Sequence, residues 1–240
     1  MSLELHYQCG SLLLAIDTCG PSGSVALGRL AGRDLEILGQ VELEGRTYSA
    51  TLVTAVRELL ASAGAGLREL GGIVAVNGPG SFTGVRVGLS AVKGLAEAGL
   101  AGAHEIPVVA LSRLLVLSRK AGVPSAALDA HRGELFLRLE RTGNDPAELL
   151  AGPAELAAVQ PPPLRVAVCD DRAAEMLALA WPATQLVQGP PPNAADALRL
   201  GESRLVAGVS VDLALLDGHY LRRSDAEIFG EAAVARQQGA

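Results

Sequence analysis

One stretch of the chain decides how its fold is interpreted: Asn77-Gly78-Pro79-Gly80-Ser81-Phe82-Thr83-Gly84-Val85-Arg86-Val87-Gly88. It follows an apolar run over residues 72–77, which predicts a buried strand, and it opens a helical pattern over residues 81–98. Ser81 is the expected N-cap, because its hydroxyl can accept a hydrogen bond from an amide of the first turn. Such a junction predicts either an anion site, since backbone N–H groups converge there, or a tight structural turn. The glycine spacing fits neither the GxGxxG fingerprint nor a P-loop.

The helix predicted over residues 81–98 is apolar or small around most of its circumference. At ~100° per residue its polar side chains fall within a stripe roughly 60° wide. One face carries Val85, Leu89, Val92 and Ala96, and a second, flat face carries Gly84, Gly88, Ala91 and Leu95. Two such faces predict cover on two sides, and the helix predicted over residues 48–63 is the natural neighbour. Either the helix is buried wholly within its own domain, or the helix pair presents apolar surface to another protein.

Working outward, strands and helices alternate in a recognisable order. Apolar runs and alternation predict strands over residues 12–16, 24–27 and 35–43, with a turn at Gly20-Pro21-Ser22-Gly23 between the first two. A further strand is expected over residues 106–110. Later in the chain, residues 164–169 predict a strand and residues 194–206 a helix. This order of strands and helices predicts an α/β fold with parallel crossovers.

The opening hairpin is echoed later in the chain. Residues 126–137 repeat the sequence of apolar strand, aspartate, glycine-containing turn and apolar strand. Asp17 and Asp129 occupy matching points, 129 − 17 = 112 residues apart. We therefore predict the actin-like ATPase (ribonuclease H-like, ASKHA) superfold, with two lobes from duplicated βββαβα units. The expected division is an N-terminal lobe with docking helices over residues 1–105, a C-terminal lobe over 106–230 and a tail over 231–240.

Composition excludes several classes of function. The net charge of −6 gives no basic field for capturing a phosphate backbone unaided, so any RNA is expected to be held by something else. Three cysteines without CxxC spacing predict neither a disulfide framework nor a zinc site, and they favour a reducing cytoplasm. The start of the chain lacks the charge pattern of a signal peptide, and no apolar run approaches the ~20 residues needed to cross a bilayer.

The chain offers few groups for catalysis. Its four histidines are scattered without a paired spacing, so no metal site is predicted, and no activated nucleophile is evident. Asp17 and Asp129 could hold a hydrated magnesium in the cleft between two lobes, or they could be turn-forming residues. A vestigial nucleotide site would comprise Asp17, Thr18, Ser81, Asp129 and Gly133. The alternative function is therefore a stand-alone ATPase or kinase of this superfold, using Asp17 and Asp129.

Four segments together resemble the TsaB family, also called YeaZ: Leu14-Ala15-Ile16-Asp17-Thr18, Gly78 to Arg86, Ala127-Leu128-Asp129-Ala130 and Tyr220-Leu221-Arg222. The run GPGSFTGVR is the specific part, whereas the strand–aspartate motifs are shared by the wider superfold. The resemblance covers residues 11–140 and returns near Tyr220. Tyr48 departs from the histidine that many relatives carry beside the serine.

The resemblance implies a role in making threonylcarbamoyladenosine on tRNA. In that family a TsaD-type subunit performs the transfer and a TsaE-type subunit supplies an ATPase, while the TsaB-type member is a non-catalytic scaffold that docks through helices of its first lobe. This implies a cytoplasmic protein with no cofactor of its own, ATP only in the partner complex, and tRNA contacted only through the complex. A homodimer is expected for the isolated chain. The expected interface residues are Tyr48, Leu52, Val56, Gly84, Arg86, Gly88, Leu89, Ala91 and Lys93.

Overall fold

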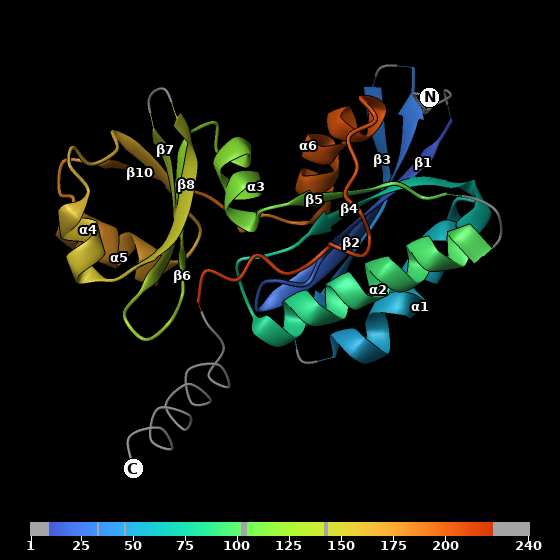
Figure 1. Cartoon of the computed structure of the whole chain (residues 1–240), viewed down its shortest axis with the longest axis horizontal. Coiled ribbons are helices and arrows are strands. Elements are labelled where there is room, and N and C mark those ends of the chain that lie inside the picture. The colour runs from blue at the N-terminus through green and yellow to red at the C-terminus, as the bar shows by residue number, and fades with distance from the viewer. Residues whose placement is uncertain (1–9, 33, 46, 102–104, 142–143, 223–240) are drawn as a thin grey trace, which may run out of the picture.

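The computed structural model describes residues 10–32, 34–45, 47–101, 105–141 and 144–222, and it has two lobes side by side (Figure 1). The first lobe is built on a five-stranded sheet in the order β3-β2-β1-β4-β5. β1 pairs antiparallel with β2 and parallel with β4, and β5 continues the parallel side. The strands are β1 (Leu12–Asp17), β2 (Ser22–Ala31), β3 (Asp34–Glu44), β4 (Leu70–Val76) and β5 (Val108–Leu111).

The second lobe repeats this arrangement. Its sheet has the order β10-β9-β6-β7-β8, so that β6, β7 and β8 form the antiparallel side and β9 and β10 the parallel side. The strands are β6 (Ser125–Asp129), β7 (Leu135–Arg141), β8 (Asn144–Ala151), β9 (Arg165–Val168) and β10 (Gln185–Gln188). Helices α1 (Tyr48–Ser62) and α2 (Phe82–Ala101) of the first lobe correspond to α4 (Pro153–Ala158) and α5 (Asp171–Ala180) of the second. The predicted α/β fold with duplicated βββαβα units is confirmed.

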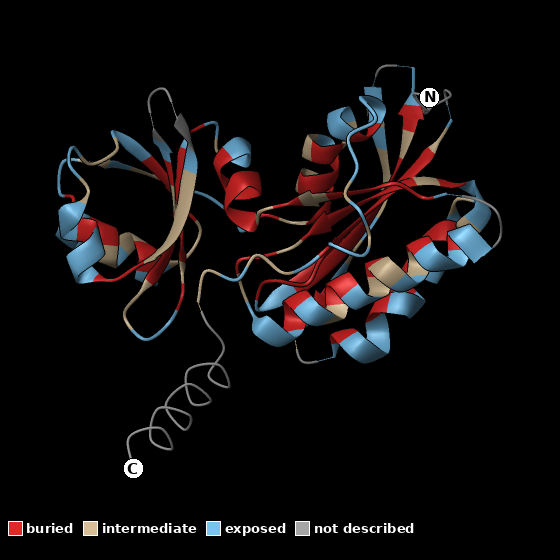
Figure 2. Cartoon of the chain, in the orientation of Figure 1, coloured by how far each residue is buried: buried red, intermediate tan, exposed pale blue. Residues whose placement is uncertain are grey.

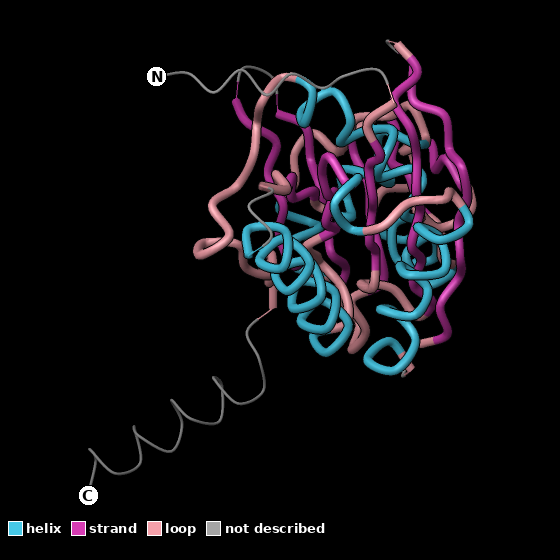
Figure 3. Tube along the Cα trace, turned by 90° about the vertical axis from the view of Figure 1, so that its right-hand side faces the viewer, coloured by secondary structure: helices cyan, strands magenta, loops and turns pink. Residues whose placement is uncertain are grey.

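Hydrophobic burial explains why the predicted elements form. All six residues of β1 are buried, as expected for a central strand with helices on both faces of its sheet. α1 and α2 cover one face of the first sheet, as Figures 1 and 3 show, and α6 (Ala194–Val206) covers the other. The helix predicted over residues 194–206 has these bounds, and Asn193 caps it by accepting a hydrogen bond from the Asp196 amide at 3.0 Å.

The division between the lobes differs from the boundary predicted at residues 105 and 106. β5 is an edge strand of the first sheet, and the chain enters the second lobe only through α3 (Arg113–Lys120). α6 then returns to the first lobe, where the Ala194 amide donates to the buried Ser24 Oγ at 2.8 Å. Gly201 of α6 packs directly on Val74 of β4. The face of the first sheet opposite α1 and α2 is therefore buried by a helix that lies late in the sequence. The predicted tail at 231–240 lies outside the described residues.

Among the described residues, no helix combines the length and the apolar content that a membrane span requires.

Candidate functional site

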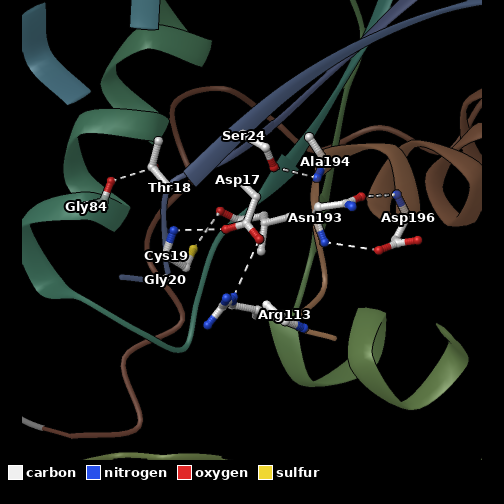
Figure 4. Close-up of polar contacts among 12 residues, drawn as sticks. Asp17, Thr18, Cys19, Gly20, Ser24, Gly84, Arg113, Asn193, Ala194 and Asp196 are labelled. Carbon is white, nitrogen blue, oxygen red and sulfur yellow. Dashed lines mark hydrogen bonds and ion pairs between the residues drawn. The ribbon is translucent and has the colours of Figure 1, made fainter. Parts of the chain in front are cut away.

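The carboxyl end of β1 places Asp17 in a buried polar cluster (Figure 4). Asp17 Oδ1 accepts a hydrogen bond from the Cys19 amide at 2.9 Å, and Oδ2 lies 3.5 Å from Arg113 Nε. Arg113 begins α3, and its guanidinium packs over Gly20, where a β-carbon would overlap it. Both side chains are buried, so the aspartate charge is neutralised within the chain.

Burial and this ion pair shift several pKa values around Asp17. Burial alone would lower the pKa of Arg113, but the groups around it, Asp17 foremost, together outweigh burial and hold that pKa above its usual value. Burial raises the pKa of the Cys19 thiol well above its usual value, and the nearby Asp17 charge adds to the effect. Burial, followed by the Asp17 charge, raises the pKa of Tyr48 to about 12. The cluster therefore holds a neutral thiol, a neutral phenol and one internal ion pair.

The turn before α2 is fixed by contacts with the residues that follow β1. The Ser81 amide donates to the Cys19 carbonyl at 2.8 Å, and Ser81 Oγ accepts from the Gly84 amide at 3.3 Å. Thr18 Oγ1 donates to the Gly84 carbonyl at 2.7 Å. Two of the backbone amides that could bind an anion, those of Ser81 and Gly84, thus already donate hydrogen bonds within the chain. Of the two interpretations of this junction, the contacts favour the tight structural turn.

The small residues of α2 serve this packing. A β-carbon at Gly84 would overlap the Thr18 carbonyl oxygen, and one at Gly88 would overlap Thr18 Oγ1. Both positions face the end of β1, so the glycines bring α2 close to its own sheet. At Gly84 and Gly88 the flat face predicted from the sequence is therefore a contact within the chain.

The second-lobe residues of the predicted nucleotide site make separate contacts. Asp129 Oδ1 accepts from the His131 amide at 2.8 Å, and Oδ2 lies 2.9 Å from His131 Nδ1. Gly133, at φ +77°, belongs to the turn that joins β6 to β7. Asp129 thus acts as a turn-forming residue here. The structure brings Asp17, Thr18 and Ser81 together, whereas Asp129 and Gly133 shape the equivalent hairpin of the other lobe.

A groove of about 410 Å³ lies between α1 and α2 on the outer side of the first lobe. Val53 is its most exposed apolar residue, with 61% of its surface accessible, and Arg86 is its one charged residue. Figure 2 shows exposed residues among buried ones along both helices. The lining residues are Tyr48, Ser49, Leu52, Val53, Arg86, Val87, Ser90 and Ala91.

The predicted interface residues divide into two groups. Six of them are buried in the chain itself: Tyr48, Leu52, Val56, Gly84, Gly88 and Leu89. Arg86 is exposed, and Ala91 and Lys93 are half-buried. The interpretation in which α2 is buried within its own domain therefore holds for the face that carries Val85, Leu89, Val92 and Ala96, and for Gly84 and Gly88. Within the groove, the apolar surface that reaches solvent comes chiefly from Val53 and the half-buried Val87, and elsewhere on α2 Phe82 and Leu100 are also exposed.

Neither valine was among the interface residues predicted from the sequence, and Arg113 was not predicted as part of a site. Val53 follows Leu52 and lies outside the apolar stripe of its helix. The helical period could therefore have indicated it as an exposed apolar residue. Arg113 carries no such signal, because its partner Asp17 lies far away in the sequence. In the described part of the chain, no three histidine, cysteine, aspartate or glutamate side chains gather closely enough to hold a metal ion.

Comparison with known sequences gives a consistent set of relatives. The TsaD family, described as tRNA N6-adenosine threonylcarbamoyltransferase, matches residues 40–156. The protein from Escherichia coli strain K12 named tRNA threonylcarbamoyladenosine biosynthesis protein TsaB is 35% identical over 130 residues, which are 52% of each chain. The Bacillus subtilis protein of the same name is 32% identical over 136 residues, 55% of this chain and 56% of that one. The chain spans about half the length of these curated relatives.

Solved structures extend the likeness over most of the chain. A Pseudomonas aeruginosa protein described as similar to peptidase YEAZ is 28% identical, with a TM-score of 0.70 over 88% of this chain and all of that one. A second structure, YeaZ from Pseudomonas aeruginosa, is 27% identical, with a TM-score of 0.65 over the same shares. Because 88% of the chain is covered, the likeness includes the second lobe.

Proposed function

Because the chain belongs to the TsaB (YeaZ) family, we propose that it takes part in forming threonylcarbamoyladenosine on tRNA, as a non-catalytic scaffold for a TsaD-type transferase. In this proposal the scaffold docks on the transferase through the α1–α2 groove. A TsaE-type ATPase joins the complex, and tRNA is contacted only through it. The same groove pairs two copies of the chain when the transferase is absent.

The groove between α1 and α2 is the observation that carries this proposal. It is a shallow, mainly apolar surface with a single cation at its margin, Arg86. Partner surfaces of this kind bury an apolar centre, and arginine is among the residues enriched at such contacts. An apolar helix that carries a carboxylate opposite Arg86 would complement it. The scaffold role is further supported by Asp17, whose carboxylate is already paired with Arg113 and the Cys19 amide.

A single charge in the groove tests the docking. In Val53→Glu the new carboxylate would have to be buried against an apolar partner, and binding to the TsaD-type subunit should fall at least about a hundredfold, since an unpaired buried charge costs several kcal/mol. The matched control is Val209→Glu, because Val209 is similarly exposed at 55% and lies beyond the end of α6. Calorimetric titration and size exclusion measure both variants. Equal binding by Val53→Glu and the unaltered chain would refute docking through this groove.

The proposed absence of catalysis has its own test. Calorimetry with ATP and magnesium on the isolated chain should give no binding that depends on Asp17, because the Asp17 carboxylate is already paired with Arg113 and the Cys19 amide. The same experiment is run on Asp129→Asn, in which the exposed hairpin retains its amide contacts. Tight nucleotide binding by the unaltered chain, lost in Asp129→Asn, would favour the alternative of a stand-alone ATPase or kinase.

A further inference from the structure

The segment Asp217–Arg222, which we name the clasp, joins the two lobes near the end of the described chain. Its first half is fixed on the first lobe at the turn between β4 and α2. The His219 amide donates to the Asn77 carbonyl at 2.6 Å, and Asn77 Nδ2 donates to the Asp217 carbonyl at 3.3 Å. Gly78 is closely covered by the backbone of His219. The clasp therefore lies against the same turn that opens α2.

The side chains of the clasp bind the second lobe. His219 Nε2 lies 2.8 Å from Glu148 Oε2, on β8. Arg222 Nη1 donates to the Ala130 carbonyl at 2.6 Å, and the guanidinium also contacts Glu134 beside the β6–β7 turn. Contacts to both lobes thus come from residues only a few positions apart.

Glu148 is the centre of this connection. It also accepts from Ser112 Oγ at 2.6 Å, at the entrance to the second lobe, and from Arg138 Nη1 at 2.7 Å. Its side chain is only 8% exposed. Burial alone would raise the pKa of Glu148, but hydrogen bonds from His219, Ser112 and Arg138 outweigh it and lower that pKa. One buried, ionised carboxylate therefore accepts hydrogen bonds from Ser112, just before α3, from Arg138 of the second lobe and from His219 of the clasp.

The clasp also reaches the groove. The rings of Tyr220 and Phe82, the first residue of α2, lie 5.1 Å apart and are tilted by 43°. Arg86 Cζ stands 4.0 Å from the centre of the Phe82 ring, on the helical turn above it. Arg86 lines the α1–α2 groove, so its position depends on a stack that begins in the clasp.

We propose that the clasp is an interlobe device that fixes the second lobe on the first and, through Tyr220 and Phe82, holds Arg86 in its place at the margin of the groove. This deepens the proposed function and rests on it, because Arg86 matters only if the groove docks a partner. The physical consequence is a coupling between two places. Weakening the contact between Glu148, in the second lobe, and His219 weakens docking, because the clasp then no longer orders the start of α2.

The test combines hydrogen exchange with binding, on the full chain. Glu148→Gln should raise amide exchange both in the β6–β7 hairpin and over residues 77–88, because it removes the charge that holds His219. Tyr220→Ala should raise exchange over residues 77–88 and weaken binding of the TsaD-type subunit by about three- to tenfold, the range expected for one aromatic or cation–π contact. Leu215→Ala, at an 80% exposed position just before the clasp, is the control and should change neither measurement.

The outcomes separate the two proposals. If the unaltered chain does not bind the TsaD-type subunit, the proposed function fails, and exchange alone decides whether the clasp joins the lobes. If the unaltered chain binds and Glu148→Gln binds equally well, the coupling is overturned while docking stands. Support requires weaker binding by both variants and a double variant whose loss is smaller than the sum of the two, because both act through the same contact.

Discussion

Replacing Gly88 by alanine should destabilise the chain, although alanine is the better helix former. A β-carbon at Gly88 would overlap Thr18 Oγ1, well inside van der Waals contact distance. Thr18 cannot move away freely, because its hydroxyl donates to the Gly84 carbonyl at 2.7 Å and the residue is buried. Either α2 shifts from the end of β1 or this hydrogen bond is broken.

The magnitude follows from three opposing contributions. Overpacking a well-filled site costs about 1–3 kcal/mol, and a lost internal hydrogen bond costs about 0.5–1.5 kcal/mol. Alanine in place of glycine within a helix returns about 1 kcal/mol. If α2 shifts and the hydrogen bond is also lost, the expected net loss is about 0.5–3.5 kcal/mol. Each kcal/mol corresponds to roughly 2–4 °C in the unfolding temperature of a chain of this size.

Gly94 provides the matched control on the same helix. A β-carbon at Gly94 meets nothing within 4 Å, so Gly94→Ala should gain about 1 kcal/mol with no opposing clash. Thermal and urea unfolding measure both variants. In a Thr18→Ala background the cost of Gly88→Ala should shrink, because the clashing hydroxyl is gone. Equal stabilisation by the two glycine replacements would refute the packing assigned to Gly88.

Three further predictions concern buried polar groups. Asp17→Asn should cost about 3–5 kcal/mol in urea unfolding, because it leaves Arg113 charged and unpaired; an unchanged midpoint would contradict the ion pair. Tyr48 should ionise near pH 12 instead of its ordinary 10.0, and an ultraviolet titration against Tyr48→Phe would show this. The pKa of Glu148 is lowered on folding, so its contribution to stability is present above its ordinary value of 4.5 and lost as pH falls through the folded value. In acid unfolding, Glu148→Gln should not show this loss of stability. Identical acid unfolding curves for the variant and the unaltered chain would contradict the lowered pKa of Glu148.

The fold was largely predictable from local patterns. Apolar runs and alternation located the strands of the opening hairpin and the helix α6, and the repeated strand–aspartate hairpin predicted two equivalent lobes. The run from Gly78 to Arg86 was the specific part of the four segments that together indicated the resemblance to the TsaB family. These features are encoded in short segments, because the period of apolar residues is set by the geometry of one helix or strand.

The candidate site depended instead on which distant segments meet. Periodicity showed that α2 has apolar residues on two sides, but only the fold shows that Gly84 and Gly88 face Thr18, leaving Val53 and Val87 at the groove. The partnership of Asp17 with Arg113 was equally hidden. The helical period gives the angle between side chains around the helix axis. It does not say which side of the helix faces the sheet.

The sequence by itself determined most elements of the first lobe, the duplicated hairpin and the family resemblance, whereas the tertiary structure decided what each apolar or charged face contacts. α6 shows the difference most clearly, since its bounds were predicted from its own residues, yet the lobe that it covers was not. Secondary structure follows from interactions between residues a few positions apart. The choice of packing partner follows from the burial of surface across the whole chain, which no short segment records.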